Sequence, residues 1–191
     1  SHWEPSLAGK QVLGVEREAK YLLVRLEGNN TLAAHLRMTG RFVYDSYAAG
    51  PAPRFTRLTL RLDQGDQVRF EDRRRFGRVW IVPTESVRQL PELADLGPDA
   101  LVEALTAERL REITSGTRRS IKALLMDQRA VGGIGNICAV EILFRAGIAP
   151  ETPANSLTDE QVSLVARLIP EFLEWAIETQ SRRELLYIGE K

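Results

Sequence analysis

The sequence is poor in cysteine and contains no long apolar run. Cys138 is the single cysteine among 191 residues, which excludes an internal disulfide and a cysteine-rich zinc site in this chain and fits a reducing compartment. No apolar run approaches the length that crosses a bilayer, and the opening Ser-His-Trp-Glu-Pro has no basic segment leading into an apolar one. We therefore expect a cytoplasmic protein with no membrane partner, and no metal or other cofactor held by this chain.

Net charge is also absent, because 26 basic residues balance 26 acidic ones, so the total charge does not indicate a nucleic-acid partner. The distribution is more informative. Basic residues gather at 69–78 and again at Arg118, Arg119 and Lys122, whereas acidic residues concentrate at 85–112 and after Glu151. Such a separation suits a protein that binds a polyanion on one side, although ordinary solvated surface explains either basic group equally well.

The hydrophobic content of 43% is enough for one good core or two small ones, and the pattern along the chain favours two. Residues 9–82 show the alternation of short strands, and tight-turn residues at 27–30 and 63–66 indicate antiparallel hairpins. We expect about six strands, at 11–15, 21–26, 31–36, 56–62, 67–70 and 78–82. The segment 1–83 is therefore predicted to be an antiparallel β-sandwich or barrel domain.

After Pro83 the period becomes helical, which predicts a linker helix within 84–96 and a helical domain over 97–191. Helices are expected at 86–94, 106–113, 119–127, 136–146 and 158–180. Thr106 is a predicted N-cap, as is either Ser156 or Thr158, and Pro170 is expected to kink or split the last helix. Residues 181–188 are compatible with a helical turn or a strand. The fold class is α+β.

The most informative segment is 127–136, where Gly132, Gly133 and Gly135 lie between two predicted helices. Glycines there permit positive φ and close approach of a ligand. Asn136 then starts a helix, whose free backbone donors and positive dipole end form a natural phosphate site. On the residues alone, the simpler interpretation is favoured, in which Asn136 is an N-cap and the glycines only interrupt the helix.

A second motif is Asp72-Arg73-Arg74-Arg75-Phe76-Gly77. Three arginines beside an aromatic ring provide phosphate clamps and a planar wedge that can enter a base stack; a solvated hairpin tip is an equally good explanation. Met38, before a Thr-Gly turn, offers another wedge, although core packing is the commoner role of a methionine. Taken alone, Lys20 is a routine surface lysine.

Five segments, in order and spacing, resemble the formamidopyrimidine-DNA glycosylase and endonuclease VIII family. They are 18–23, 35–40, 72–77, 96–101 and 121–150. Leu-Gly-Pro-Asp-Ala-Leu at 96–101 and Gly-Ile-Gly-Asn-Ile at 133–137 point to the formamidopyrimidine branch, whose substrates are oxidised purines. The resemblance implies an antiparallel β-sandwich followed by a helix-two-turn-helix domain, with duplex DNA bound in the cleft between them.

The resemblance also implies roles for individual residues. The residues that would intercalate into DNA and fill the space of an everted nucleotide are Met38, Arg74 and Phe76. Those that would hold the phosphates around the lesion are Lys20, His35, Asn136 and, as a weaker match, Arg75. Lys122 matches a lysine near the damaged-base pocket.

Some family features have no counterpart here. The family's nucleophilic N-terminal proline, the glutamate beside it and a four-cysteine zinc finger match no segment of this chain, so no catalytic or metal residue is assigned. Pro5 cannot replace the nucleophile, because its nitrogen is an amide. Cys138, Val140 and Arg73 also depart from the family pattern. Two explanations stay open: a piece of a longer enzyme, which we favour, or a degenerate homologue that binds DNA without cutting it.

The expected function is repair of double-stranded DNA containing oxidised purines, such as 8-oxoguanine and formamidopyrimidines, or abasic sites. A bifunctional DNA glycosylase and abasic-site lyase would flip the base out and proceed through a Schiff base, acting as a monomer. One alternative is a non-catalytic module that binds damaged DNA. The other sets the resemblance aside and takes the helical domain as a protein-interaction domain. The role of residues 181–191 is left open.

Overall fold

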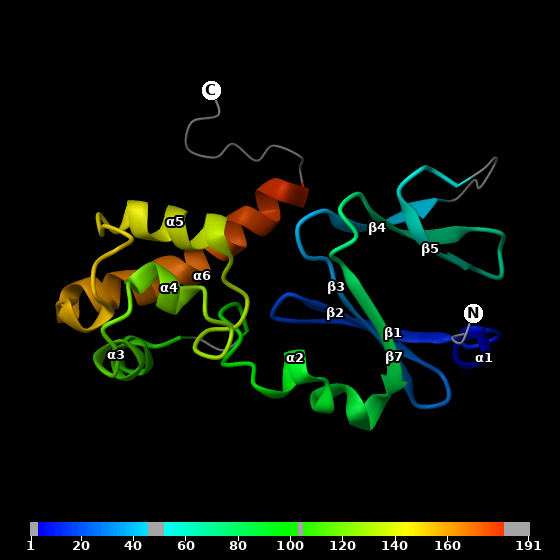
Figure 1. Ribbon diagram of the computed structural model, residues 1–191, viewed down its shortest axis with the longest axis horizontal. Helices are drawn as coiled ribbons and strands as arrows, with labels where there is room; N and C mark the ends of the chain where they lie inside the picture. The colour runs from blue at the N-terminus through cyan, green and yellow to red at the C-terminus, as the bar shows by residue number, and fades with distance from the viewer. Residues whose placement is uncertain (1–3, 46–51, 103–104, 182–191) are drawn as a thin grey trace. The chain divides into compact units, whose positions relative to one another are not determined.

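The chain folds into two compact units, Ser1–Gln89 and Leu90–Lys191 (Figure 1). The computed structural model describes residues 4–45, 52–102 and 105–181. The boundary between the units falls inside the segment 84–96, which the sequence assigns to a linker. The first unit is called the β unit below and the second the helical unit.

The β unit contains two antiparallel sheets. One has the strand order β1-β2-β3-β7 and the other β4-β6-β5. Their bounds are β1 Val12–Glu18, β2 Tyr21–Leu26, β3 Asn30–His35, β4 Gly40–Asp45, β5 Thr56–Arg61, β6 Gln67–Asp72 and β7 Arg78–Pro83, after a short helix α1 at Glu4–Leu7. The antiparallel β domain is thus confirmed, and the six expected strands are all present.

The seventh strand, β4, is one that the sequence did not predict. It opens with Gly40 and is only six residues long, so its own pattern resembles the continuation of the turn at Thr39. Its partner is β6, where Phe42 pairs with Phe70 and Asp45 with Gln67. A partner more than twenty residues away in sequence makes this segment a strand, which a local pattern cannot show.

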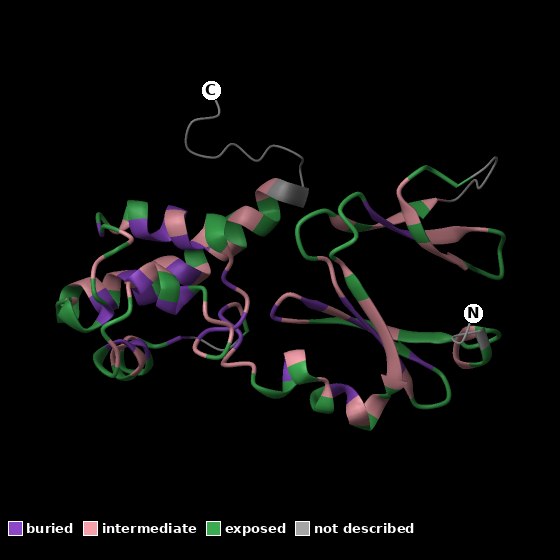
Figure 2. Cartoon of the chain, viewed as in Figure 1, coloured by how far each residue is buried: buried purple, intermediate pink, exposed green. Residues whose placement is uncertain are grey.

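The two sheets bury a small core between them. Leu26, Leu32 and Ala34 of the first sheet meet Phe42 and Leu60 of the second. In contrast, β1 is exposed over most of its length (Figure 2). The turn before β3 places Gly28 and Asn29 at positive φ, of 81° and 60°, as a tight hairpin requires.

The helical unit packs its helices around one larger core (Figure 1). A 3-10 turn η1, Thr84–Gln89, closes the β unit. The elements that follow are α2 Pro91–Ala94, α3 Ala107–Ser115, α4 Ile121–Leu125, α5 Asn136–Arg145, η2 Ala154–Ser156 and α6 Asp159–Ser181. Both α3 and α5 contact α6, and Ile142, Ile169 and Phe172 are almost completely buried there.

Most of the expected helix starts are confirmed. Thr106 Oγ1 accepts a hydrogen bond from Arg109 N at 3.2 Å. At α6 the cap is Thr158 rather than Ser156. Its hydroxyl accepts from Gln161 N at 3.3 Å, and Gln161 Oε1 accepts from Thr158 N at 3.0 Å, a reciprocal capping box.

One helix prediction is wrong, and one of the two outcomes expected at Pro170 is excluded. The single helix expected at 86–94 is divided into η1 and α2, because Pro91 holds Leu90 in an extended conformation and starts a new helix. The split expected at Pro170 does not occur, since α6 runs through it. A proline removes one backbone hydrogen bond, and burial of the neighbouring Ile169 and Phe172 compensates. Residues 182–188 lie outside the described residues.

No helix in the described ranges is both long and apolar enough to span a bilayer.

Candidate nucleic-acid interface

In the β unit, a buried carboxylate organises the loop between β6 and β7. Asp72 is only 1% exposed, and it accepts hydrogen bonds from Gly77 N at 2.7 Å, Arg74 N at 3.1 Å and the Thr39 hydroxyl. Burial alone would raise the pKa of Asp72, but these hydrogen bonds and one from Arg75 N outweigh it and lower the pKa. Since Thr39 belongs to the β3–β4 loop, Asp72 ties two loops together.

The two tied loops present Met38, Arg74 and Phe76 as one exposed cluster. Met38 is 70% exposed and Phe76 is 51% exposed, so the core-packing interpretation of Met38 is wrong. The Arg74 guanidinium lies 4.7 Å from the centroid of the Phe76 ring, and its NH1 donates to Sδ of Met38 at 2.9 Å. Two exposed apolar side chains are thus held on one guanidinium group.

Lys20 and His35 lie at the ends of neighbouring strands. Lys20 is in the turn between β1 and β2, after Ala19, whose φ is 50°. His35 ends β3 and pairs in register with Tyr21, and the two rings meet edge to face at 4.7 Å. His35 Nδ1 also accepts from Arg37 N at 3.0 Å, which fixes the imidazole at the start of the loop that carries Met38. Because Lys20 directly precedes Tyr21, both residues lie at the end of the sheet where β3 leads into the loop of Met38.

Arg75 occupies a different position from its neighbour Arg74. Its φ is 60°, and the side chain is exposed. The left-handed backbone at Arg75 reverses the chain between Arg74 and Phe76. Gly77 ends the turn, and only glycine fits at this position because a Cβ there would lie 2.5 Å from Cζ of Phe70.

In the helical unit, Gln128 holds the glycine-rich turn between α4 and α5. Its amide nitrogen donates to the carbonyls of Met126 and Ile134, each at 2.9 Å, and its Oε1 accepts from Gly133 N at 3.0 Å. Gly133 has a φ of 101°, a conformation that favours glycine. The turn is therefore a fixed structure rather than a simple break between helices.

Asp127 also stabilises the glycine-rich turn, by accepting hydrogen bonds from residues on either side of itself in the sequence. It accepts from Arg119 NH1 at 2.7 Å and from Arg129 N at 3.1 Å, and these contacts, with Arg119 first, lower the pKa of the Asp127 carboxyl. The segment before α3 also packs on the turn, where a Cβ at Gly97 would lie 2.5 Å from the carbonyl oxygen of Arg129. Gly97 of the Leu-Gly-Pro-Asp segment is thus required for close backbone contact.

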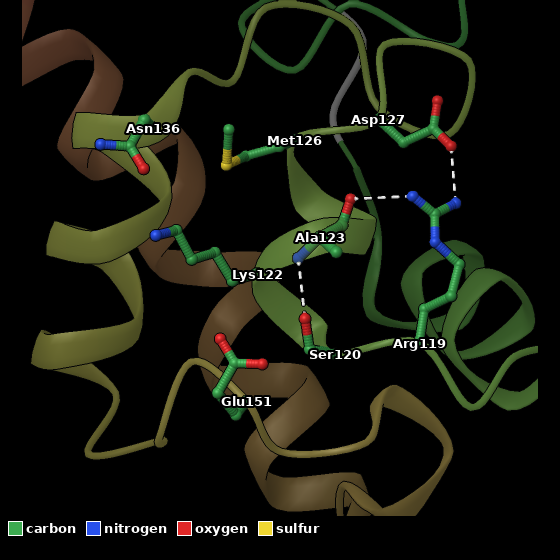
Figure 3. Close-up of a pocket in the computed structure, with 8 residues that line it drawn as sticks. All are labelled: Arg119, Ser120, Lys122, Ala123, Met126, Asp127, Asn136 and Glu151. Atoms are coloured by element: carbon green, nitrogen blue, oxygen red, sulfur yellow. Dashed lines mark hydrogen bonds and ion pairs between the residues drawn. The ribbon is translucent and has the colours of Figure 1, made fainter.

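The interpretation of Asn136 as an N-cap is wrong. Gly135 is the N-cap of α5, so no side chain caps this end, and Asn136 is the first helical residue. Its side chain lines an open pocket together with Lys122, Met126 and Glu151 (Figure 3). The uncapped N–H groups and positive dipole end of α5, with the nearby Lys122 ammonium, form an environment suited to an anion.

Sequence reasoning found the exposed residues of both loops and missed Asp72 and Gln128 as the residues that hold them. The aspartate directly before an arginine run was the available signal for Asp72, because aspartate commonly accepts from backbone N–H groups just after it. Nothing in the sequence singles out Gln128. As to metal, no three His, Cys, Asp or Glu side chains gather into a group that could hold an ion over the described ranges.

The fold and the site together describe a two-domain protein, in which an antiparallel β unit precedes a helical unit whose glycine-rich turn starts an uncapped helix. Two family models match the chain. The formamidopyrimidine-DNA glycosylase N-terminal domain matches residues 1–79, and the formamidopyrimidine-DNA glycosylase H2TH domain matches residues 96–184. The chain belongs to the formamidopyrimidine-DNA glycosylase family.

Individual relatives agree with this assignment. The formamidopyrimidine-DNA glycosylase of Moorella thermoacetica is 47% identical over 171 residues, which is 90% of this chain and 62% of that protein. That of Pelotomaculum thermopropionicum is 41% identical over 94% of this chain and 65% of that protein. The chain thus spans less than two thirds of the length of these relatives.

A solved structure gives the same result. The Lactococcus lactis formamidopyrimidine-DNA glycosylase, non-covalently bound to DNA containing an abasic site, matches with a TM-score of 0.85 and 30% identity. The match covers 92% of this chain and 66% of that one. Another structure of the Lactococcus lactis protein, in complex with DNA containing a formamidopyrimidine lesion, matches with a TM-score of 0.86 and 29% identity.

Proposed function

We propose that this chain is the DNA-gripping part of a DNA glycosylase and abasic-site lyase that excises oxidised purines from duplex DNA. The observation that carries the proposal is the exposed Met38–Arg74–Phe76 cluster. Two apolar groups around a guanidinium have the size and chemistry to enter a base stack and fill the space left by an everted nucleotide. The proposal is supported by membership of the formamidopyrimidine-DNA glycosylase family.

The same proposal gives the remaining residues their roles. In the β unit, the phosphates beside the lesion are held by Lys20, His35 and the exposed Arg75. Their positive or hydrogen-donating groups lie near the loops that carry the Met38–Arg74–Phe76 cluster, called the wedge below. The partner is double-stranded DNA with an oxidised purine or abasic site, bound by a monomer in the bacterial cytoplasm.

In the helical unit, Asn136 and the first-turn N–H groups of α5 bind a phosphate through the backbone, which makes this contact independent of sequence. Lys122, in the same pocket, lies close enough to help neutralise that phosphate or to approach the damaged base.

The test compares duplexes that differ only at one position: an undamaged one and one with a tetrahydrofuran abasic analogue. Wild-type protein should prefer the abasic duplex, and Arg74→Ala should lose most of that preference, because the wedge gains only where the stack is already open. Asn136→Ala should weaken binding to both duplexes similarly. Equal affinity of the wild type and both variants for the two duplexes would overturn the proposal.

Catalysis needs a separate measurement. Borohydride reduces an imine to a stable amine, so trapping on an 8-oxoguanine duplex detects a Schiff-base intermediate. A covalent protein–DNA complex supports the glycosylase and lyase. The trapping experiment uses the protein at the length that the cell makes, with its intact mass and N-terminal residue measured in the same sample, because no residue of this chain is assigned as the nucleophile. Specific binding of that protein to the abasic duplex without trapping would instead establish a non-catalytic protein that recognises damaged DNA.

A further inference from the structure

A second group of arginines lies beside the proposed wedge and has no role in it. The Phe55 ring, which precedes β5, has two guanidinium groups near it. The guanidinium carbon of Arg54 lies 5.5 Å from the ring centroid and that of Arg73 lies 5.6 Å from it. Both arginine side chains are exposed, and Phe55 is half-buried.

This arrangement is favourable for binding an anion. Stacking on an aromatic ring restricts the guanidinium group while leaving its N–H donors available for hydrogen bonds. Two like charges on one ring repel each other, and in the part of the chain that the structure describes no ion pair joins either of them to a carboxylate. An oxyanion between or beside them would relieve the repulsion and accept several charge-assisted hydrogen bonds.

The backbone connects this group to the wedge. Asp72 N donates to the Phe55 carbonyl at 3.0 Å, and Arg57 Nε donates to the Asp72 carbonyl at 2.9 Å. The Asp72 carboxylate meanwhile holds the loop of Arg74 and Phe76. The buried Asp72 therefore fixes both the arginines around Phe55 and the Met38–Arg74–Phe76 cluster. If that cluster enters a duplex, the phosphates next to the entry point would lie near Arg54 and Arg73.

We propose that Arg54 and Arg73, stacked on Phe55, form a second phosphate-binding site that holds the duplex beside the lesion. The proposal rests on the proposed function, because it takes duplex DNA as the partner. Unlike the Met38–Arg74–Phe76 cluster, this second site would recognise phosphates rather than the lesion. A phosphate contact away from the wedge acts on damaged and undamaged duplex alike.

The experiment measures the affinity of the full chain for abasic and undamaged duplexes over a range of salt concentrations. The Arg54→Ala/Arg73→Ala variant should bind both duplexes on the order of tenfold more weakly at moderate salt. Its plot of log affinity against log salt should be shallower by about 0.9 for each phosphate that the variant no longer neutralises. Its preference for the abasic duplex should be unchanged.

Two further variants separate the site from general charge and from folding. Lys10→Ala/Arg61→Ala removes the same charge from exposed positions of the same unit and should keep more of the affinity and slope. Arg54→Lys/Arg73→Lys keeps the charge but not the planar fork, so it should retain the salt slope while losing part of the affinity. Urea unfolding of each variant shows whether the fold is intact.

The outcomes distinguish this inference from the proposed function. If Arg74→Ala loses the abasic preference while Arg54→Ala/Arg73→Ala keeps wild-type affinity and salt slope, the second site is overturned and the function stands. An equal loss in the Lys10→Ala/Arg61→Ala control would also overturn it, because general charge would then explain the effect. If wild-type protein binds neither duplex, both proposals fail.

Discussion

The two surfaces proposed to bind DNA, one in each unit, are built differently. In the β unit, side chains form the surface, and Met38, Arg74 and Phe76 project from two loops that a buried carboxylate holds. In the helical unit, the backbone forms it, since the Gly133 turn leads into an uncapped helix and a glutamine side chain holds the turn from within. In the proposed function, the first surface enters the base stack and the second binds a phosphate.

The difference shows why each surface needs its particular support. Water does not hold exposed apolar side chains in one position, so the positions of Met38 and Phe76 depend on hydrogen bonds within the loops that carry them. Asp72, which is almost fully buried, accepts those hydrogen bonds. A backbone phosphate site needs only the correct path of the chain, which glycines permit and a few side-chain contacts maintain. Removing the supporting side chain should therefore lower the unfolding free energy and weaken DNA binding more in the β unit than in the helical unit.

The largest effect is expected from Asp72→Ala. The substitution leaves Gly77 N and the Thr39 hydroxyl without their acceptor and leaves Arg74 N with Thr39 Oγ1 alone, so the β unit should lose about 2–4 kcal/mol of unfolding free energy. The abasic preference should disappear because Met38 and Arg74 are no longer held together. Urea unfolding and fluorescence anisotropy with labelled duplex measure the two effects.

Asp66→Asn is the matched control for Asp72→Ala, since Asp66 contacts Tyr44 at an exposed hairpin of the same unit. A variant at Asp72 that is no worse than this control would show that the wedge does not depend on the buried carboxylate.

A smaller effect is expected from Gln128→Ala. The change removes three hydrogen bonds that hold the glycine-rich turn, and the helical unit should lose roughly 1–3 kcal/mol. Affinity for damaged and undamaged duplex should fall by the same factor, because a phosphate contact carries no information about the base. Gln64→Ala, in an exposed turn of the β unit, is the control. A selective loss of the abasic preference would contradict this division of roles.

Acid should weaken both supports together. The pKa values of Asp72 and Asp127 are both lowered from an ordinary 3.8, so their stabilising contributions are complete above that pH and are lost as the pH falls below it. The chain has three tryptophans, so Trp80 in the β unit and Trp175 in the helical unit each report their own unit when the other one and Trp3 are both replaced by phenylalanine. Acid titration of Asp72→Asn should show a smaller loss in the β unit than in wild type; an unchanged acid transition would contradict the role of Asp72.

The smallest effect on DNA binding is expected from Thr158→Ala. It removes the capping hydroxyl of α6 and should reduce the stability of the helical unit by about 1 kcal/mol. Affinity for either duplex should not change, because the cap supports the core rather than the proposed phosphate site. Thermal unfolding and anisotropy on the same sample test both statements, and a loss of affinity would show that the turn and the core are coupled.

The sequence predicted the fold better than it predicted the supports of the site. Thr106 and Thr158 were recognisable as caps because their partners lie three residues away. The strand β4 was missed because its partner β6 is distant in sequence. Of the kink and the split that proline allows at Pro170, only the structure excluded the split, since burial of Ile169 and Phe172 outweighs the local effect of proline.

By itself, the sequence determined the two-part organisation, the hairpins, most of the helices and the family, because strand alternation, turn residues, caps and motif spacing are all short-range patterns. Only the tertiary structure decided which residues hold the candidate site. Asp72 reaches Thr39 across 33 positions, and Arg54 and Arg73 meet on one ring. Such contacts depend on how the loops and strands pair in three dimensions, and no local pattern records them.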